Sequence, residues 1–162
     1  MKFKLVPEPP ASLDVVTDAQ RAVPLVPDTE DDCCARLMRR LDFPSRDVAR
    51  TWLTFLRALR LAEETPSGFK RTDVDPTRET LREAFVDRVF GASEVVDALE
   101  ATEALTADEA FERLRDRVPT WEHHKNPTEW EAVWRERVER VLDWLTLLGA
   151  AERTADGRYR RA

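Results

Sequence analysis

Isoleucine is absent from this chain of 162 residues, asparagine occurs once, and only four of the 26 basic residues are lysines. Cysteine occurs only at Cys33 and Cys34, and such an adjacent pair provides no disulfide framework. No apolar run approaches the roughly 20 residues of a membrane span. The N-terminal stretch MKFKLVPEPP lacks the apolar core of a signal peptide. We therefore expect a cytoplasmic protein that makes no membrane contact.

The sequence also lacks the patterns that are typical of enzymes and metal sites. No Ser/His/Asp arrangement, carboxylate pair or glycine-rich phosphate loop stands out, and glycine occurs only four times. His123-His124 and Cys33-Cys34 are metal-ligating residue types, but neighbouring residues on a helix point about 100° apart. Neither pair has the spacing of a zinc site. The sequence therefore predicts no enzymatic activity, no metal and no cofactor.

Acidic residues outnumber basic ones by 32 to 26, which gives a net charge of −6. This balance argues against a protein that coats nucleic acid, because such proteins carry a basic excess. The charge is uneven, since residues 76–162 sum to −5 whereas residues 42–71 sum to +2. The composition, rich in arginine and acidic residues and free of isoleucine, resembles that of a haloarchaeal or other high-GC proteome, and we favour the haloarchaeal interpretation.

The most informative feature is a pattern that occurs twice. Residues 46–72 and 135–161 align without a gap, and nine of the 27 positions are identical. The identical pairs are Arg46/Arg135, Leu53/Leu142, Leu56/Leu145, Leu59/Leu148, Ala62/Ala151, Glu63/Glu152, Thr65/Thr154, Gly68/Gly157 and Arg71/Arg160. In both copies an amphipathic helix leads directly into a short hairpin with glycine at its tip. The repeat predicts two copies of one structural unit.

Local signals predict the elements of the first unit. An edge strand at 2–6 and a short helix near 13–21 come first. A helix capped by Asp28 or Thr29 runs to about Leu41, the turn DFPS follows, and Ser45 caps a helix to about Arg60. Strands at 61–65 and 69–72 then flank a turn. The stretch TDVDP at 72–76 predicts a boundary, so we expect units at 1–74 and 75–162.

The second unit is predicted to be more helical. Asp75 with Pro76 opens a helix to about Phe90, and Ser93 caps another. Capping boxes at Thr106 and Thr128 open two more helices, the second of which runs to Leu148. Asp156-Gly157 indicates a hairpin with a two-residue turn at 150–161.

The order helix, short turn, helix and hairpin at 30–72 resembles a winged helix-turn-helix. The residues that carry the resemblance are the apolar stripe of Cys34, Leu37, Met38 and Leu41, the turn at 42–45, the helix at 45–60 and the Gly68 hairpin. Residues 76–161 resemble the same fold. The resemblance implies a mainly α protein with small β-hairpins, built from two winged-helix-like units in tandem. Winged helices often place the second helix of the turn in the major groove of DNA, whereas others bind only protein.

Basic side chains gather along one edge of the helix at 45–60. At about 100° per residue this edge lies beside the apolar face, and two further cations follow on the hairpin. Arginine forms bidentate hydrogen bonds with phosphates and guanine edges. The residues that we predict to contact duplex DNA are Arg46, Arg50, Arg57, Arg60, Lys70 and Arg71. Leu53 lies within this stripe and indicates a partly covered edge or a protein contact.

The long helix of the second unit has a different outer face. Glu139 lies in the middle of the corresponding edge and would repel phosphate, so we interpret this unit as structural or protein-binding. The side chains expected in the two cores are Trp52, Phe55, Leu56, Leu59, Trp130, Trp134, Val141, Trp144, Leu145 and Leu148. Two functions stay open: a DNA-binding or transcription-associated regulator that uses the first unit, or a protein-interaction or assembly module without nucleic-acid contact. The oligomeric state is not defined by the sequence.

Overall fold

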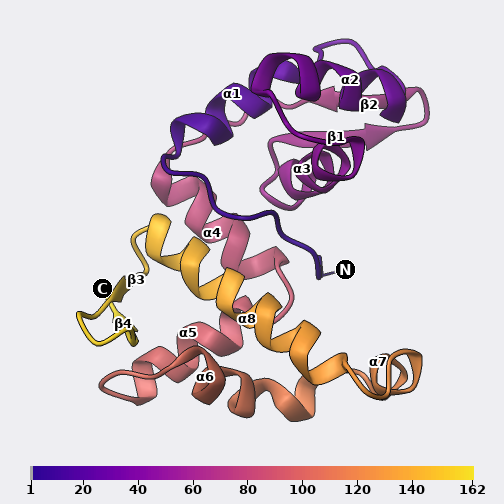
Figure 1. Ribbon diagram of the computed structural model, residues 1–162. Helices are drawn as coiled ribbons and strands as arrows, with labels where there is room; N and C mark the ends of the chain where they lie inside the picture. The colour runs from indigo at the N-terminus through magenta and orange to yellow at the C-terminus, as the bar shows by residue number, and fades with distance from the viewer. Residues whose placement is uncertain (1) are drawn as a thin grey trace. The chain divides into compact units, whose positions relative to one another are not determined.

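The computed structural model describes residues 2–162, which form two units that meet in sequence at Val89 and Phe90 (Figure 1). In the first unit, threonine or serine hydroxyls cap three helices: Thr29, Ser45 and Thr77 accept hydrogen bonds from backbone N–H groups three residues later. The elements of this unit are α1 (Asp14–Ala22), α2 (Glu30–Leu41), α3 (Arg46–Ala58), β1 (Ala62–Thr65), β2 (Gly68–Arg71) and α4 (Arg78–Arg88).

The second unit repeats this order with an insertion between its second and third principal helices. A capping box opens α6, because Thr106 and Glu109 each accept a hydrogen bond from the other's backbone N–H. The elements are α5 (Ala92–Ala101), α6 (Ala107–Leu114), the 3₁₀ turn η1 (Arg115–Arg117), α7 (Thr120–Lys125), α8 (Trp130–Leu147), β3 (Ala151–Arg153) and β4 (Tyr159–Arg161). The insertion comprises η1, α7 and their flanking turns.

Both units are winged helices, and both predicted hairpins are confirmed. β1 pairs antiparallel with β2, and β3 pairs antiparallel with β4. In each unit the residue before the N-cap of the second helix adds a third backbone partner to the hairpin. Asp28 and Phe69 exchange backbone hydrogen bonds of 3.0 and 2.7 Å, and Leu105 and Tyr159 exchange bonds of 2.8 and 2.7 Å. These bridges bind each hairpin to its helices, and the sequence analysis did not predict them.

The two copies of the repeat share the same backbone conformation at the C-terminal ends of α3 and α8. The N–H of Leu61 donates to the carbonyl of Leu56 at 2.8 Å, and Ala150 donates to Leu145 at the same distance. The residue before each donor has positive φ, 64° at Arg60 and 79° at Gly149. This is the Schellman arrangement, which turns the chain sharply out of a helix. Both copies of the repeat therefore connect the helix to the hairpin through the same backbone arrangement.

The second hairpin differs from the predicted two-residue turn. β3 and β4 pair from Ala151↔Arg161 to Arg153↔Tyr159, so residues 154–158 form the connection, whereas β1 and β2 are joined by two residues. Thr154 holds the longer loop, since its N–H donates to the carbonyl of Arg158 at 2.8 Å. The ungapped alignment therefore ends at the hairpin tip, because the second hairpin contains an additional residue.

Several predicted helix starts are also corrected. α4 begins after Thr77 rather than after Asp75, and α5 follows Gly91 rather than Ser93. The capping box expected at Thr128 does not form, since Glu129 precedes α8 and makes no side-chain cap.

The predicted strand at 2–6 is reduced to one parallel bridge between Phe3 and Val89. α4 packs within the first unit, which places the division after Val89, whereas the sequence placed it at residues 74 and 75.

The cores form around the apolar faces of α3 and α8, as predicted. Trp130 is half-buried, and the other expected core side chains are at most 5% exposed. Phe55 of α3 packs edge-on against Trp52 and Phe85, with ring centroids 5.9 and 6.1 Å apart. In the second unit, Tyr159 of β4 is 1% exposed and donates its hydroxyl to Asp143 of α8. Phe55 thus joins α3 to α4 in the first core, and Tyr159 joins α8 to its wing in the second.

Candidate nucleic-acid interface

α3 is the second helix of the helix-turn-helix in the first unit, and its N-terminal half (residues 46–54) has an exposed outer face. The side chains of Arg46, Asp47 and Arg50 are 52, 84 and 55% exposed. Thr51 and Thr54 lie half-buried on the same half of the helix. Two exposed cations and two half-buried threonines therefore lie on the part of α3 that follows the turn, and the Thr51 hydroxyl donates to the carbonyl of Asp47 at 3.0 Å.

Acidic neighbours restrain these two arginines. Arg46 forms an ion pair with Asp31 and lies 3.8 Å from the carboxylate of Glu30, while Arg50 binds Asp47 at 2.9 Å. Exposed pairs of this kind contribute about 0–1 kcal/mol to stability. A phosphate or a base edge can therefore replace the carboxylate with little loss of free energy. The ion pairs orient the guanidinium groups but leave them able to bind a ligand.

Arg57 is in a different environment from Arg46 and Arg50. Its side chain is 26% exposed, and its guanidinium lies 5.9 Å from the ring of Phe3 and 5.6 Å from the ring of Phe69. It also lies 3.7 Å from the carboxylate of Glu64. Cation–π contacts on two rings, with an ion pair, join the helix to β2 and to the N-terminal segment. The structure therefore places Arg57 in a packing position.

The other three predicted residues lie beyond α3. Arg60 follows the helix in a left-handed conformation and pairs with Asp87 of α4. Lys70 lies 3.3 Å from the carboxylate of Glu63, its partner across the hairpin. Arg71 donates its Nε to the carbonyl of Val23 at 3.0 Å. The six predicted cations therefore differ in their surroundings: Arg46 and Arg50 pair with acidic side chains near the start of α3, whereas the other four contact the hairpin, α4 or the segment after α1.

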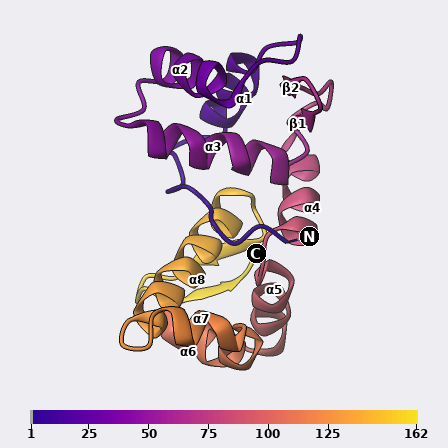
Figure 2. The same cartoon turned by 90° about the vertical axis from the view of Figure 1, so that its right-hand side faces the viewer.

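The C-terminal half of α3 is covered by two segments of the same unit. Arg88 of α4 donates a guanidinium N–H to the carbonyl of Arg57 at 2.8 Å. The N-terminal arm (residues 2–10) runs beside α3 and ends near α4 (Figures 1 and 2). Leu53, which lies in the predicted arginine stripe near the middle of α3, is 2% exposed. The sequence indicated a covered edge at Leu53, but it gave no sign that the arm and α4 supply contacts here.

Where the arm passes the N-terminal half of α3, the surface is hollowed. This recess has a volume of about 370 Å³. It is lined by Leu5 of the arm and by Asp47, Arg50, Thr51 and Thr54 of α3. Leu5 is 55% exposed and lies beside the charged groups of this recess. The recess therefore combines apolar and charged groups on the outer face of the helix-turn-helix.

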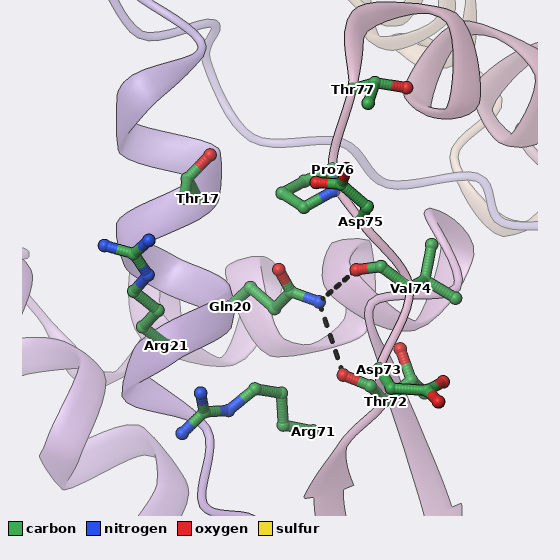
Figure 3. A pocket seen from close by; sticks show the side chains of 10 residues that line it. All are labelled: Thr17, Gln20, Arg21, Arg71, Thr72, Asp73, Val74, Asp75, Pro76 and Thr77. Carbon is green, nitrogen blue, oxygen red and sulfur yellow. Dashed lines mark hydrogen bonds between the residues drawn. The ribbon is translucent and has the colours of Figure 1, made fainter.

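A second recess lies between α1 and the segment that joins β2 to α4 (Figure 3). Its volume is about 440 Å³, and its lining is mostly polar. Gln20 is 6% exposed and donates its side-chain amide to the carbonyls of Val74 at 2.8 Å and Thr72 at 3.4 Å. Figure 3 shows the amide reaching across from α1 to this segment. Gln20 thus holds the chain that leads into α4.

The second unit presents acidic groups on the helix that corresponds to α3. Glu136 and Glu139 of α8 are exposed. Arg135 lies within 3.6 Å of both Asp108 and Glu112, and Arg140 lies 3.4 Å from Glu136. α8 carries four acidic and three basic residues, so a phosphate would meet net negative charge on this helix.

The two pairs of metal-ligating residue types lie in different units. Cys33 and Cys34 are buried in α2, and burial raises the pKa of Cys33 to about 11, so the thiolate form is disfavoured. His123 of α7 stacks on Trp130 at 3.7 Å. Within residues 2–162, no group of three or more His, Cys, Asp or Glu side chains is placed to hold a metal ion. Over the same residues, no helix has both the length and the apolar surface that crossing a bilayer requires.

Comparison with known proteins identifies the architecture over the whole chain. A family model described as the halobacterial double winged helix domain matches residues 1–162. No match was found among curated proteins or among solved structures. The match agrees with the two winged helices described above and with the composition of the chain.

Proposed function

The chain belongs to the halobacterial double winged helix family, and from this premise we propose that it is a DNA-binding regulator that contacts duplex DNA through its first unit. The observation that supports the proposal is the exposure of Arg46 and Arg50 on the N-terminal half of α3, directly after the turn of the helix-turn-helix. This half of the second helix is the part that enters the major groove in related folds.

The chemistry of these side chains suits a duplex. Guanidinium groups bind phosphates and the O6 and N7 atoms of guanine, and threonine hydroxyls bind phosphates or base edges. We assign Lys70 on the hairpin, which lies 3.3 Å from the carboxylate of Glu63, to a contact with the DNA backbone. Arg57 packs on two aromatic rings, Arg60 pairs with Asp87, and Arg71 donates to the carbonyl of Val23. We assign these three arginines to supporting this surface rather than to reading the DNA.

Charge separates the two units and favours the first as the DNA-binding one. The first unit carries 15 basic and 16 acidic residues, whereas the second carries 11 and 16. At about 1 M salt the screening length is only about 3 Å, so binding under halophilic conditions depends on direct contacts rather than long-range attraction. Arginine pairs that reach a base edge or phosphate meet this requirement.

The test compares duplex binding by the wild type and by Arg46→Ala/Arg50→Ala. Pooled genomic duplex fragments are titrated across a salt series. We expect the double variant to bind more weakly and to show a shallower dependence on salt, because each lost phosphate contact reduces the logarithmic slope by about 0.9.

A second double variant controls for net charge. Arg39 of α2 and Arg78 of α4 are exposed in the same unit, and neither lines the recess beside the N-terminal half of α3. Arg39→Ala/Arg78→Ala should keep most of the wild-type affinity although it removes the same charge. The proposal fails if the wild type retains no duplex at low salt, or if the two double variants bind alike.

A protein partner is the second candidate, and the acidic outer face of α8 favours it. Glu136 and Glu139 are exposed there, and Trp121 of the inserted α7 is 54% exposed. Exposed tryptophan is common in protein interfaces. If the wild type retains no duplex but co-purifies with a stoichiometric protein, and Glu136→Lys/Glu139→Lys loses that protein, this second function is the better supported one.

A further inference from the structure

We infer that the N-terminal arm is part of the DNA-reading surface, with Leu5 as a specificity residue that contacts the C5-methyl group of thymine beside Arg50. The inference rests on the proposed function, because it assigns the arm a role at the same surface. It starts from the recess lined by Leu5, Asp47, Arg50, Thr51 and Thr54, which lies on the outer face of α3.

The arm is fixed to the first unit on both sides of Leu5. Phe3 donates its N–H to the carbonyl of Arg88 at 2.8 Å, and its side chain is 6% exposed. The guanidinium groups of Arg57 and Arg88 lie 5.9 and 5.2 Å from the Phe3 ring. Val6 is 4% exposed, and Pro7 is buried. Leu5 therefore projects from a segment that is held at its neighbours, and its place beside α3 is set by the fold.

The exposure of Leu5 runs against the surrounding pattern. The side chains that anchor the arm are buried, while Leu5 is 55% exposed and faces the recess with Thr51 and Thr54. An apolar group held outward on a rigid segment loses little conformational entropy when a ligand covers it. The apolar part of the recess therefore suits a small apolar group on the ligand.

The charged part of the recess selects among such ligands. Arg50 is oriented by its ion pair with Asp47 at 2.9 Å and can donate to acceptors on a base edge. In the major groove, thymine presents a methyl group, and a neighbouring guanine presents the O6 and N7 acceptors that arginine binds. A thymine–guanine step offers both kinds of contact within one recess.

The experiment removes the methyl group from the DNA and the apolar side chain from the protein. Duplexes retained by the wild type are selected from a random pool, and deoxyuridine then replaces thymidine at one position at a time. At one position in each site, the replacement should weaken wild-type binding about fourfold, which corresponds to the burial of one methyl group at about 0.8 kcal/mol. Leu5→Ala should bind the thymidine duplex more weakly by a similar factor and should no longer distinguish the two duplexes.

Leu25→Ala is the matched control. Leu25 is 69% exposed in the same unit but does not line the recess. This variant should keep both the affinity and the methyl dependence of the wild type. Because the methyl contact is apolar, the fourfold ratio should also persist when salt is raised, while the affinity itself falls.

The outcomes separate this inference from the proposed function. If the wild type binds duplex but Leu5→Ala keeps full sensitivity to deoxyuridine, the arm does not read the base and only the inference fails. Tighter binding by Leu5→Ala would also overturn it, because the arm would then be an obstruction. If the wild type selects no duplex at all, the proposed function fails and the inference fails with it.

Discussion

At the scale of single residues, arginines on one edge of α3 have different surroundings. Arg50 is exposed and pairs with Asp47 of its own helix, whereas Arg57 lies near two aromatic rings. The difference comes from what passes beside each position. The N-terminal arm and β2 supply the rings of Phe3 and Phe69 at Arg57, and the fold leaves Arg50 open at the recess.

Phe55 provides the clearest test of the core at this scale. Its ring is fully buried and packs edge-on against Trp52 and Phe85. Phe55→Ala should reduce the free energy of unfolding by about 3–5 kcal/mol, because the substitution removes apolar burial and leaves a cavity. Denaturant unfolding of the wild type and variant measures the difference. A loss under about 1 kcal/mol would mean that the ring is not enclosed.

At the scale of elements, the wings depend on glycine for two different reasons. Gly68 begins β2 with φ +127°, and a Cβ built there would lie 2.2 Å from the carbonyl oxygen of Asp28. Gly157 has φ +82° in the longer loop, and nothing lies within 4 Å of its Cβ position. The first glycine permits the close backbone approach of the bridge to Phe69, and the second only permits the turn.

Alanine at each glycine should separate these two effects. Gly157→Ala should reduce the free energy of unfolding by about 1 kcal/mol, the conformational penalty of positive φ for an L-residue. Gly68→Ala should cost clearly more, because the new methyl group also displaces the backbone that pairs with Phe69. Thermal or denaturant unfolding of the two single variants provides the comparison. Equal losses would show that the close approach at Asp28 is unimportant for stability.

At the scale of the whole molecule, α4 decides where the first unit ends. Leu81 and Phe85 of α4 are fully buried, and Phe85 packs against Phe55 of α3. Gln20 holds the segment that leads into this helix by binding the carbonyls of Thr72 and Val74. A unit that ended at residue 74 would lack Leu81 and Phe85, and the side of Phe55 that packs against Phe85 would be exposed. α4 therefore completes the core of the first winged helix.

Fragments of the chain test this boundary. A fragment of residues 1–89 should unfold cooperatively, whereas a fragment of residues 1–74 should lose at least about 3 kcal/mol, on the scale of deleting one buried phenylalanine. Circular dichroism during denaturant unfolding would measure both fragments. Equal stability of the two fragments would show that α4 is only a connection and would favour the boundary at residues 74 and 75.

The sequence by itself determined the local structure of this protein. Ser45 and Thr106 mark helix starts because a cap needs only neighbouring backbone groups, and the repeated helix-to-hairpin segments predict both wings because helical periodicity and turns are local properties. The arginine edge of α3 and the core positions of Phe55 and Leu145 follow from the same periodicity. These signals were sufficient for the double winged helix.

Only the tertiary structure decided which of these residues remain available to a ligand. Phe3 pairs with Val89, Asp28 with Phe69, and Leu105 with Tyr159, and each pair joins residues that are far apart in the sequence. Such contacts depend on how elements pack rather than on any local pattern. They bring the arm and α4 onto α3, turn Arg57 into a packing residue, and leave Arg50 beside Leu5, because one surface of a helix cannot face both a packed neighbour and solvent.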